Sequence, residues 1–329
     1  MSDVVHLRRA LHRHPELGLH LPKTQAAVVD ALRSMGLEPR VGDGLSSVVA
    51  DIEGAGSGRT VLLRGDMDAL PMPEATGLEF SSTIDGTMHA CGHDAHTAML
   101  VGAARLLVER RSEFSGTVRL MFQPGEEQPG GAPLMISEGV LDGVDAAFAL
   151  HVAPTLWSGM IAWKAGPVMA SSDVLTVTVS GRGGHASTPH WATDPVPVAC
   201  EIVLALQQMV TRTVDVFDPA VLTIAQLDAG TTDNVIPESA RLIGTLRAVF
   251  ERTRRAVWER ISTVADGIAA AHGCTATVHI EEGYPVTHND ARFAPFAAGV
   301  AADVLGQWHI PKPSSGLHGT SDHLKQKRQ

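Results

Sequence analysis

The sequence predicts an α/β protein of two domains, and three observations carry this prediction. Short apolar strands alternate with amphipathic helices over the first half of the chain, and acidic or histidine side chains follow directly after several strands. The second half has the order β-α-β-β-α-β, which is typical of a ferredoxin-like unit. A chain of 329 residues with 44% hydrophobic residues is also long enough for two cores.

The first part of the chain begins with two predicted helices before any strand. The opening helical pattern breaks at His14 and Pro15, and the second helix ends at Gly36, a typical C-cap residue. The apolar strand that ends at Arg64 is of the kind buried in a parallel sheet. After the first helix, the predicted elements are a helix over 24–35, strands over 47–52 and 60–64, a helix over 97–108, and strands over 116–122 and 146–150.

The second part begins where the composition changes, near Gly166 and Pro167. Because a β-α-β-β-α-β unit can fold alone, we expect an inserted domain over residues 168–282. The β-branched strand 174–180 is expected to pair through an exposed edge with a second copy, which predicts a homodimer. The predicted elements are strands over 174–180, 220–227, 240–250 and 275–281, with helices over 195–214 and 253–272.

The composition argues against several classes of partner. With 36 acidic and 26 basic residues, the formal charge is -10, which predicts no nucleic-acid binding. No segment approaches the roughly twenty apolar residues that a membrane span needs, and the N-terminus lacks the apolar core of a signal peptide. Cys91, Cys200 and Cys274 lie far apart in sequence, which argues against a disulfide framework and for a reducing cytoplasm.

The densest group of potential metal ligands is Met-His-Ala-Cys-Gly-His-Asp-Ala-His, over residues 88–96. Thiolate plus imidazole is the ligand mixture that zinc and the later divalent first-row ions prefer, and a glycine lets the backbone bend around an ion. We expect Cys91 and His93 to be ligands, with His89 and His96 as supporting or packing residues. A histidine-rich surface turn is the simpler alternative.

Further candidate ligands come directly after three predicted strands: Asp66 and Asp68, then Glu126 and Glu127, then His151. Open α/β sheets place ligands beyond the carboxyl ends of their strands, so we expect these side chains at one edge of a sheet. Taken singly, each has a simpler explanation as a turn residue, a solvated acidic pair or a histidine at a strand end. Taken together, they predict a site.

Four of these side chains, Cys91, His93, Glu127 and His151, offer one sulfur, two imidazoles and one carboxylate. The sulfur argues against magnesium or calcium and leaves zinc, manganese, cobalt or nickel. A hydrolytic site also needs a carboxylate free of the metal to move protons, and adjacent glutamates can divide these two roles. A thiol enzyme with Cys91 as nucleophile is less favoured, because a thiolate among so many donors is better explained as a ligand.

The expected organisation is therefore a catalytic metal-binding domain that is interrupted by the inserted one. Residues 1–167 form its first part, and a helix over 291–305 returns to it, so that residues 283–310 belong to it as well. Residues 311–329 are polar and rich in Ser, Gly and Lys, which predicts a disordered or non-native tail.

Six segments, in order along the chain, resemble the amidohydrolase branch of the dinuclear zinc-peptidase superfamily, which contains N-acyl-amino-acid, hippurate and auxin-conjugate hydrolases. They are LHRHPELG (11–18), RGDMDALP (64–71), HACGHD (89–94), FQPGEE (122–127), GRGGHAS (181–187) and NVIP (234–237). The resemblance implies a zinc-exopeptidase-like catalytic domain with an inserted ferredoxin-like dimerisation domain. It also implies cleavage of the amide bond of N-acyl amino acids or similar small amide conjugates.

The resemblance also implies roles for single residues and about two divalent ions per subunit. The metal ligands would be Cys91, His93, Glu127 and His151. Glu126 would be the general base that activates water and later protonates the leaving amine, and Asp68 a carboxylate that orients a ligand.

In the inserted domain, the resemblance implies that His185 reaches the partner subunit's catalytic site and helps to hold the substrate, with Asn234 nearby. Without the resemblance, His185 would be a turn histidine and Asn234 a loop residue.

One departure from the family concerns the end of the chain. The resemblance implies a late histidine that completes the metal site, and the sequence offers only His318 or His323 in its place. We therefore expect the C-terminal part of the catalytic domain to be truncated. The alternative function is a catalytically impaired metal-binding dimeric remnant that lacks this ligand.

Overall fold

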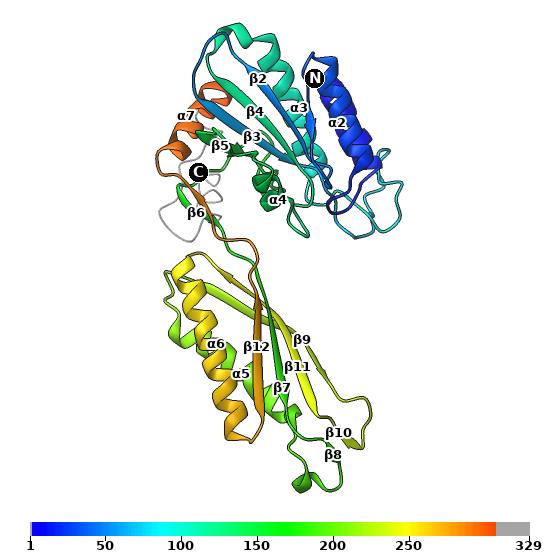
Figure 1. Cartoon of the computed structure of the whole chain (residues 1–329), viewed down its shortest axis with the longest axis vertical. Helices are drawn as coiled ribbons and strands as arrows, with labels where there is room; N and C mark the ends of the chain where they lie inside the picture. Colours follow the sequence, from blue (N-terminus) through cyan, green and yellow to red (C-terminus); the bar gives the residue numbers. More distant parts are fainter. Residues whose placement is uncertain (1, 307–329) are drawn as a thin grey trace, which may run out of the picture. The chain divides into compact units, whose positions relative to one another are not determined.

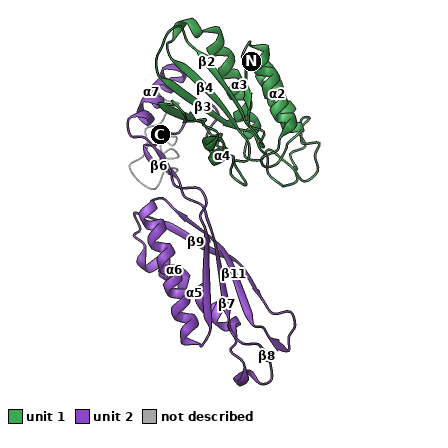
Figure 2. Ribbon diagram, in the orientation of Figure 1, with its two compact units in different colours: residues 1–155 green, residues 156–329 purple. Residues whose placement is uncertain are grey.

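The computed structural model describes residues 2–306 (Figure 1). Contacts divide the chain into two compact units, the first over residues 1–155 and the second from Leu156 onward (Figure 2). Each unit has its own hydrophobic core. The tail predicted over 311–329, with His318 and His323, lies outside the described residues.

The first unit is built on five strands: β1 (Arg40–Val41), β2 (Val48–Glu53), β3 (Thr60–Asp66), β4 (Thr117–Gln123) and β5 (Ala146–Ala149). They form one mixed sheet in the order β1-β2-β4-β3-β5. Strand β3 lies between β4 and β5 and runs parallel to both, whereas β2 is antiparallel to β1 and β4. The three parallel strands therefore end at the same edge.

Around this sheet lie α1 (Ser2–Arg13), α2 (Pro22–Ser34), α3 (His93–Glu109) and α4 (Gly131–Ser137). Leu120 and Phe122 of β4 pack with α2 and α3, whereas Met121, between them, packs with Met135 of α4. Successive side chains of a strand point to opposite faces, so β4 is buried from both sides. Helices thus cover both faces of the sheet, while its carboxyl edge stays available for a site.

The helices and strands predicted for the first part of the chain are present. Helix α3 begins at His93 rather than at residue 97, so the second half of the His/Cys motif is helical. The sequence does not predict β1 or α4, because segments of 2 and 7 residues are too short to show a periodicity.

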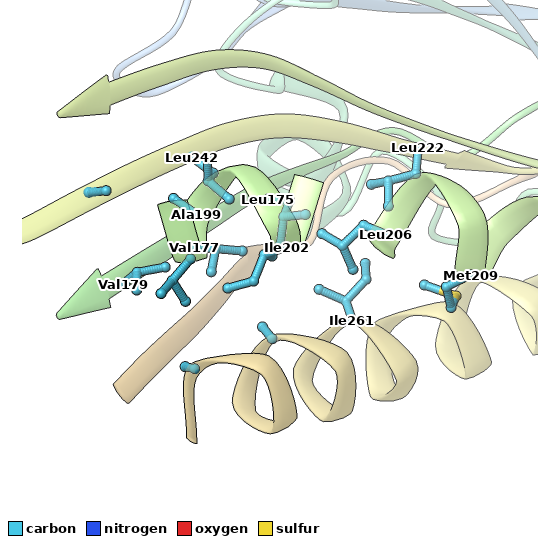
Figure 3. Packing of buried hydrophobic residues seen from close by; sticks show 14 of the residues in the cluster. Leu175, Val177, Val179, Ala199, Ile202, Leu206, Met209, Leu222, Leu242 and Ile261 are labelled. Atoms are coloured by element: carbon cyan, nitrogen blue, oxygen red, sulfur yellow. The ribbon is translucent and has the colours of Figure 1, made fainter. Parts of the chain in front are cut away.

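The second unit contains β7 (Asp173–Ser180), α5 (Pro195–Thr213), β9 (Ala220–Ala229), β11 (Ser239–Ala248), α6 (Glu251–Ala271) and β12 (Thr275–Glu281). This is the predicted β-α-β-β-α-β order, and the strands form an antiparallel sheet in the order β12-β7-β11-β9. Leu175 and Val177 of β7 pack against Ile202 of α5 and Ile261 of α6 (Figure 3). Both helices therefore cover the same face of this sheet.

The expectation that the strand over 174–180 offers a free edge is wrong. Strand β7 pairs with β11 on one side and with β12 on the other, so its main-chain hydrogen bonds are made within the unit. The edge strands are β9 and β12. The alternation of side chains along β7 shows that one face of the strand is buried, but it does not show whether the strand lies at the edge of the sheet.

The remaining elements of the second unit are β6 (Gly166–Met169), β8 (Gly184–His185), β10 (Val235–Ile236), β13 (Thr287–Asn289) and α7 (Phe293–Leu305). Strand β6 pairs with β13, and β8 pairs with β10. Helix α7 is the one predicted over 291–305, and its Ala298 and Ala302 pack with Trp163. The division of the chain at residues 168 and 283 remains a prediction.

Within residues 2–306, no helix combines the length and the apolar character that crossing a membrane requires.

Candidate metal centre

Three parallel strands deliver polar side chains to one edge of the sheet in the first unit. Asp68 follows β3, Glu126 and Glu127 follow β4, and His151 follows β5. Helix α3 contributes His93 as its first residue. Because β3 lies between its parallel neighbours β4 and β5, these segments meet at the carboxyl edge, as the sequence predicts.

His93 lies at the centre of the potential donors. Its ring is buried, and its Nδ1 donates to the main-chain oxygen of Asp68 at 2.9 Å. A carbonyl oxygen can only accept, so Nδ1 carries a proton, and Nε2 offers its lone pair when the ring is neutral. This Nε2 lies 3.8 Å from an oxygen of Glu126 and 4.0 Å from an oxygen of Glu127.

Cys91 and His151 form a second pair of donors beside His93. The sulfur of Cys91 lies 3.3 Å from Nε2 of His151, while Nδ1 of His151 donates to the main-chain oxygen of Val152 at 2.7 Å. Both histidines thus use Nδ1 for a backbone carbonyl and leave Nε2 for the other donors. This is the tautomer that most metal-binding histidines adopt.

Three overlapping groups of potential ligands share His93. One contains Cys91 and His151, one contains Glu126 and Glu127, and the third is the buried pair of Asp66 and His96. Within each group the potential ligand atoms lie within 4.8 Å of one another. Thiolate, imidazole and carboxylate at this spacing can hold zinc or a related divalent ion.

The electrostatics of the groups also fit a cation. Burial, together with the neighbouring Glu127 and Glu126, raises the pKa of the Cys91 thiol to about 12. Burial and the charge of Asp66 likewise raise the pKa of Glu126. Among the described residues, Nε2 of His93 and one oxygen of Glu127 are buried without a hydrogen-bond partner. A positive ion would offset the excess negative charge and pair these atoms, which are costly to bury alone.

Asp68 holds three of the donors in place. Its two carboxylate oxygens accept the main-chain N–H groups of Glu126 and Glu127, at 2.8 Å and 3.0 Å, and its carbonyl oxygen accepts from His93. The side chain is buried. These are the contacts of a residue that orients ligands rather than of one that meets a substrate.

Asp66 and His96 form a buried pair behind the donors, where the sequence predicts a candidate ligand at Asp66 and a supporting or packing residue at His96. Nδ1 of His96 donates to Asp66 at 2.6 Å, and Arg64 lies 2.6 Å from the other carboxylate oxygen. Burial opposes the ionisation of Asp66, but the hydrogen bond from His96 and the charge of Arg64 outweigh it and lower the pKa to about 2. The available signals were the Asp-x-Asp spacing after β3 and the i, i+3 spacing of two histidines on one helix face.

The other two histidines of the motif differ from His93 in their surroundings. His96 lies close to Asp66 and His93, but both of its ring nitrogens are hydrogen-bonded, since Nε2 accepts the N–H of Val152 at 2.9 Å. His89 is buried without a hydrogen-bond partner among the described residues, and burial lowers its pKa to about 4. His89 is therefore neutral and packs in the interior.

His185 and Asn234 belong to the second unit, whereas all the donors above belong to the first. Strands β8 and β10 place Val235 opposite His185, and the N–H of Ala186 donates to the main-chain oxygen of Asn234 at 3.1 Å. Both side chains are exposed. The structure thus brings His185 and Asn234 together at one end of paired strands.

Over residues 62–324, a range that includes all the donors above, the chain matches the description Peptidase family M20/M25/M40. It is 42% identical over 305 residues to N-acetylcysteine deacetylase of Bacillus subtilis (strain 168), a match that covers 92% of this chain and 80% of that protein. It is 40% identical over 291 residues to N-acyl-L-amino acid amidohydrolase of Geobacillus stearothermophilus, covering 88% of this chain and 79% of that protein.

Among solved structures, the chain is similar to the Bacillus subtilis YXEP protein, described as a dinuclear metal binding peptidase from M20 family. The TM-score is 0.84 at 37% sequence identity, and the match covers 99% of this chain and 85% of that one. A family match over most of the sequence, relatives at about 40% identity over most of their own length and a shared fold lead to one conclusion: the chain belongs to peptidase family M20/M25/M40.

Proposed function

We propose that this protein is a metal-dependent amidohydrolase that cleaves the amide bond of N-acyl amino acids or similar small amide conjugates. The observation that carries the proposal is the set of donor groups that share His93, with Glu126 as an adjacent carboxylate whose pKa is raised. The two relatives described above are named for hydrolysis of such amides, which supports the same substrate class.

The proposed cofactor is a pair of divalent ions per chain, drawn from zinc, manganese, cobalt and nickel. The residues that would hold them are Cys91, His93, Glu127 and His151, and the dinuclear description of the similar solved structure supports the number. When bound, such ions polarise a carbonyl group and lower the pKa of water.

Glu126 is the proposed general base. Its carboxylate lies within 3.8 Å of Nε2 of His93, and burial raises its pKa toward the range in which a base works near neutral pH. The carboxylate takes a proton from the attacking water and returns it to the amide nitrogen as the C–N bond breaks. The products are a carboxylic acid and a free amino acid.

The second unit is proposed to bind the substrate and to form the dimer. His185 and Asn234 lie together and are exposed, so an imidazole and an amide are available for a substrate oxygen or carboxylate. The homodimer is proposed to form through this unit. A cytoplasmic location is proposed because Cys91, Cys200 and Cys274 are all free thiols.

The proposal is tested with purified full-length protein loaded with zinc, manganese, cobalt or nickel. We expect hydrolysis of a panel of N-acetyl and N-benzoyl amino acids, measured as release of the free amino acid. Glu126→Gln is expected to lower kcat by about 10²- to 10⁴-fold while the bound metal remains.

Glu127→Gln is the matched control, because the adjacent residue is a proposed ligand. It is expected to lower the metal content first, whereas Glu126→Gln is expected to leave it near the wild-type level. Hydrolysis retained in Glu126→Gln would contradict its role as base. One metal ion or none per chain, with no turnover, would favour the non-catalytic metal-binding alternative.

A further inference from the structure

His151 lies on a segment that follows strand β5 and is not fixed by the hydrogen bonds of that strand. Strand β5 ends at Ala149, and residues 150–153 after it are in no helix or strand and are exposed. A metal ligand must nevertheless be held to within a fraction of an ångström to be useful. Two contacts fix this segment beside Cys91 and His93, one from His96 and one from Gly92.

The first contact comes from His96, whose ring is buried on α3. Nε2 of His96 accepts the main-chain N–H of Val152 at 2.9 Å, one residue beyond His151. Since Nε2 accepts, the ring proton lies on Nδ1, which donates to Asp66 at 2.6 Å. The His96 and His151 rings also meet edge to face, with centroids 4.7 Å apart.

The His96 ring is itself fixed from behind. Asp66 is fully buried at the end of β3, and Arg64 lies 2.6 Å from the oxygen that does not bond His96. The ring therefore has one donor and one acceptor contact in fixed directions, which leaves it a single orientation. A rigid acceptor of this kind can define where the Val152 N–H must lie.

The second contact is steric and comes from Gly92. This residue has a φ of +85°, and a Cβ added to it would lie only 2.3 Å from Cγ2 of Val152. The Val152 side chain thus fills the space that the missing Cβ leaves open. Gly92 lies between Cys91 and His93, so this packing joins the His151 segment directly to the loop that carries the other two donors.

We infer that His96 is a positioning residue of the metal centre, which holds His151 against Cys91 and His93 through the main chain of Val152. This inference rests on the proposed function, because it concerns the same donor groups. It assigns the third histidine of the motif a task other than ligation. The chain Arg64–Asp66–His96–Val152 then carries the rigidity of β3 to an exposed ligand.

The test uses Co²⁺ binding to the full-length protein as a readout that is independent of turnover. Titration followed by visible absorption reports the affinity and the coordination geometry, and thiolate-to-cobalt charge transfer reports Cys91. We expect His96→Leu to weaken Co²⁺ binding by about 10- to 100-fold and to change the spectrum. His96→Gln, whose carbonyl oxygen can still accept the Val152 N–H, is expected to keep a larger share of the affinity.

Thr97→Val is the matched control. Thr97 is fully buried on the same helix and donates to the main-chain oxygen of Asp66 at 2.7 Å, but no hydrogen bond joins it to Val152 in the described part of the chain. It is expected to bind Co²⁺ as the wild type does. If His96→Leu fails to fold, Val152→Pro removes the same hydrogen bond from the exposed side, with Val152→Ala as its control.

The two possible failures are distinguishable. Wild-type protein that binds no Co²⁺, or binds it without a thiolate band, would overturn the proposed metal centre. Wild-type binding with His96→Leu and Val152→Pro indistinguishable from their controls in affinity and spectrum would overturn the role of His96 alone. Thermal unfolding of each metal-free variant separates a change in the site from a loss of fold.

Discussion

At the scale of single residues, the protonation of Cys91 is the feature that would govern metal uptake by the proposed centre. Burial and the neighbouring glutamates raise the pKa of the thiol to about 12, so the metal-free protein carries a neutral thiol at pH 7. A metal ligand must be the thiolate. Metal binding therefore has to displace a proton, which lowers the observed affinity below that of the thiolate form.

We predict that metal affinity rises with pH because of this displaced proton. At pH values below the thiol pKa of about 12, the fraction of thiolate rises about tenfold with each pH unit. If binding releases one proton, the metal affinity therefore rises by up to about tenfold per pH unit. Calorimetric titration with Zn²⁺ in buffers of different ionisation enthalpy counts the protons. Cys91→Ser is expected to release about one proton fewer, and an unchanged count would contradict thiolate ligation.

A second prediction concerns the carboxylate of Asp68. In Asp68→Asn one of the two oxygens becomes an N–H donor that faces the N–H of Glu126 or Glu127, so one hydrogen bond is replaced by a repulsion. We expect a loss of about 10- to 100-fold in metal affinity or kcat. Asp51→Asn is the control, because it removes charge from a carboxylate on β2 that is bonded to Arg119 on β4. Equal effects of the two changes would contradict a positioning role for Asp68.

At the scale of elements, helix α6 contacts both the first residue of β7 and the segment after β12 through one side chain. Arg254 is almost fully buried on α6 and pairs through both nitrogens with Asp173, the first residue of β7. It also donates to the main-chain oxygen of Gly283, just after β12, at 3.0 Å. Trp258 adds a hydrogen bond to Asp173 at 3.2 Å. One side chain thus links the first strand of the four-stranded sheet with the segment that follows its last strand.

We predict that Arg254→Met destabilises the second unit by about 3–5 kcal/mol, because it leaves the buried Asp173 carboxylate without its cation. The matched control is Arg255→Met, since Arg255 is its half-exposed neighbour and pairs with Glu251 and Glu282 at the surface. That change is expected to cost about 0–1 kcal/mol. Urea unfolding followed by tryptophan fluorescence measures both. Equal losses would show that the buried pair has no special weight.

At the scale of the whole molecule, the free edges of the second sheet decide how a dimer can form. Because β7 is interior, pairing between copies has to use β9 or β12. Strand β9 exposes Val221 and Leu227, at 60% and 41%, along an edge that no other strand covers within the described chain. An apolar exposed edge of this kind is a template for pairing with another chain.

We predict a homodimer that the double change Val221→Lys and Leu227→Lys converts to a monomer. Lysines at an edge oppose strand pairing by charge and solvation. Light scattering after size exclusion measures the mass. Val174→Lys is the control, because Val174 is 41% exposed but lies on the interior strand β7. A monomeric control together with a dimeric double variant would place the contact on the face of the sheet instead.

The pattern of residues along the chain was enough to predict the long helices and strands and most of the donor set. Hydrophobic periodicity follows from which side of a helix or strand is buried, so the long elements were predictable, and side chains placed after strands Thr60–Asp66 and Thr117–Gln123 marked the site. The pairing of strands was not predictable in the same way. The interior place of β7 depends on hydrogen bonds between segments far apart in sequence, and periodicity carries no record of them.

The residues behind the proposed metal ligands could not be assigned from the sequence, because their contacts form only in the folded chain. The residue type alone does not show whether a histidine near a ligand coordinates a metal, packs in the interior or positions another residue. We infer a positioning role for His96 because folding brings Asp66 to one ring nitrogen and Val152 to the other, across separations of 30 and 56 residues. His89, in the same motif, found no such partners among the described residues and is a packing residue. The motif determined which atoms were available, and the packing of β3, α3 and the segment after β5 determined what each one does.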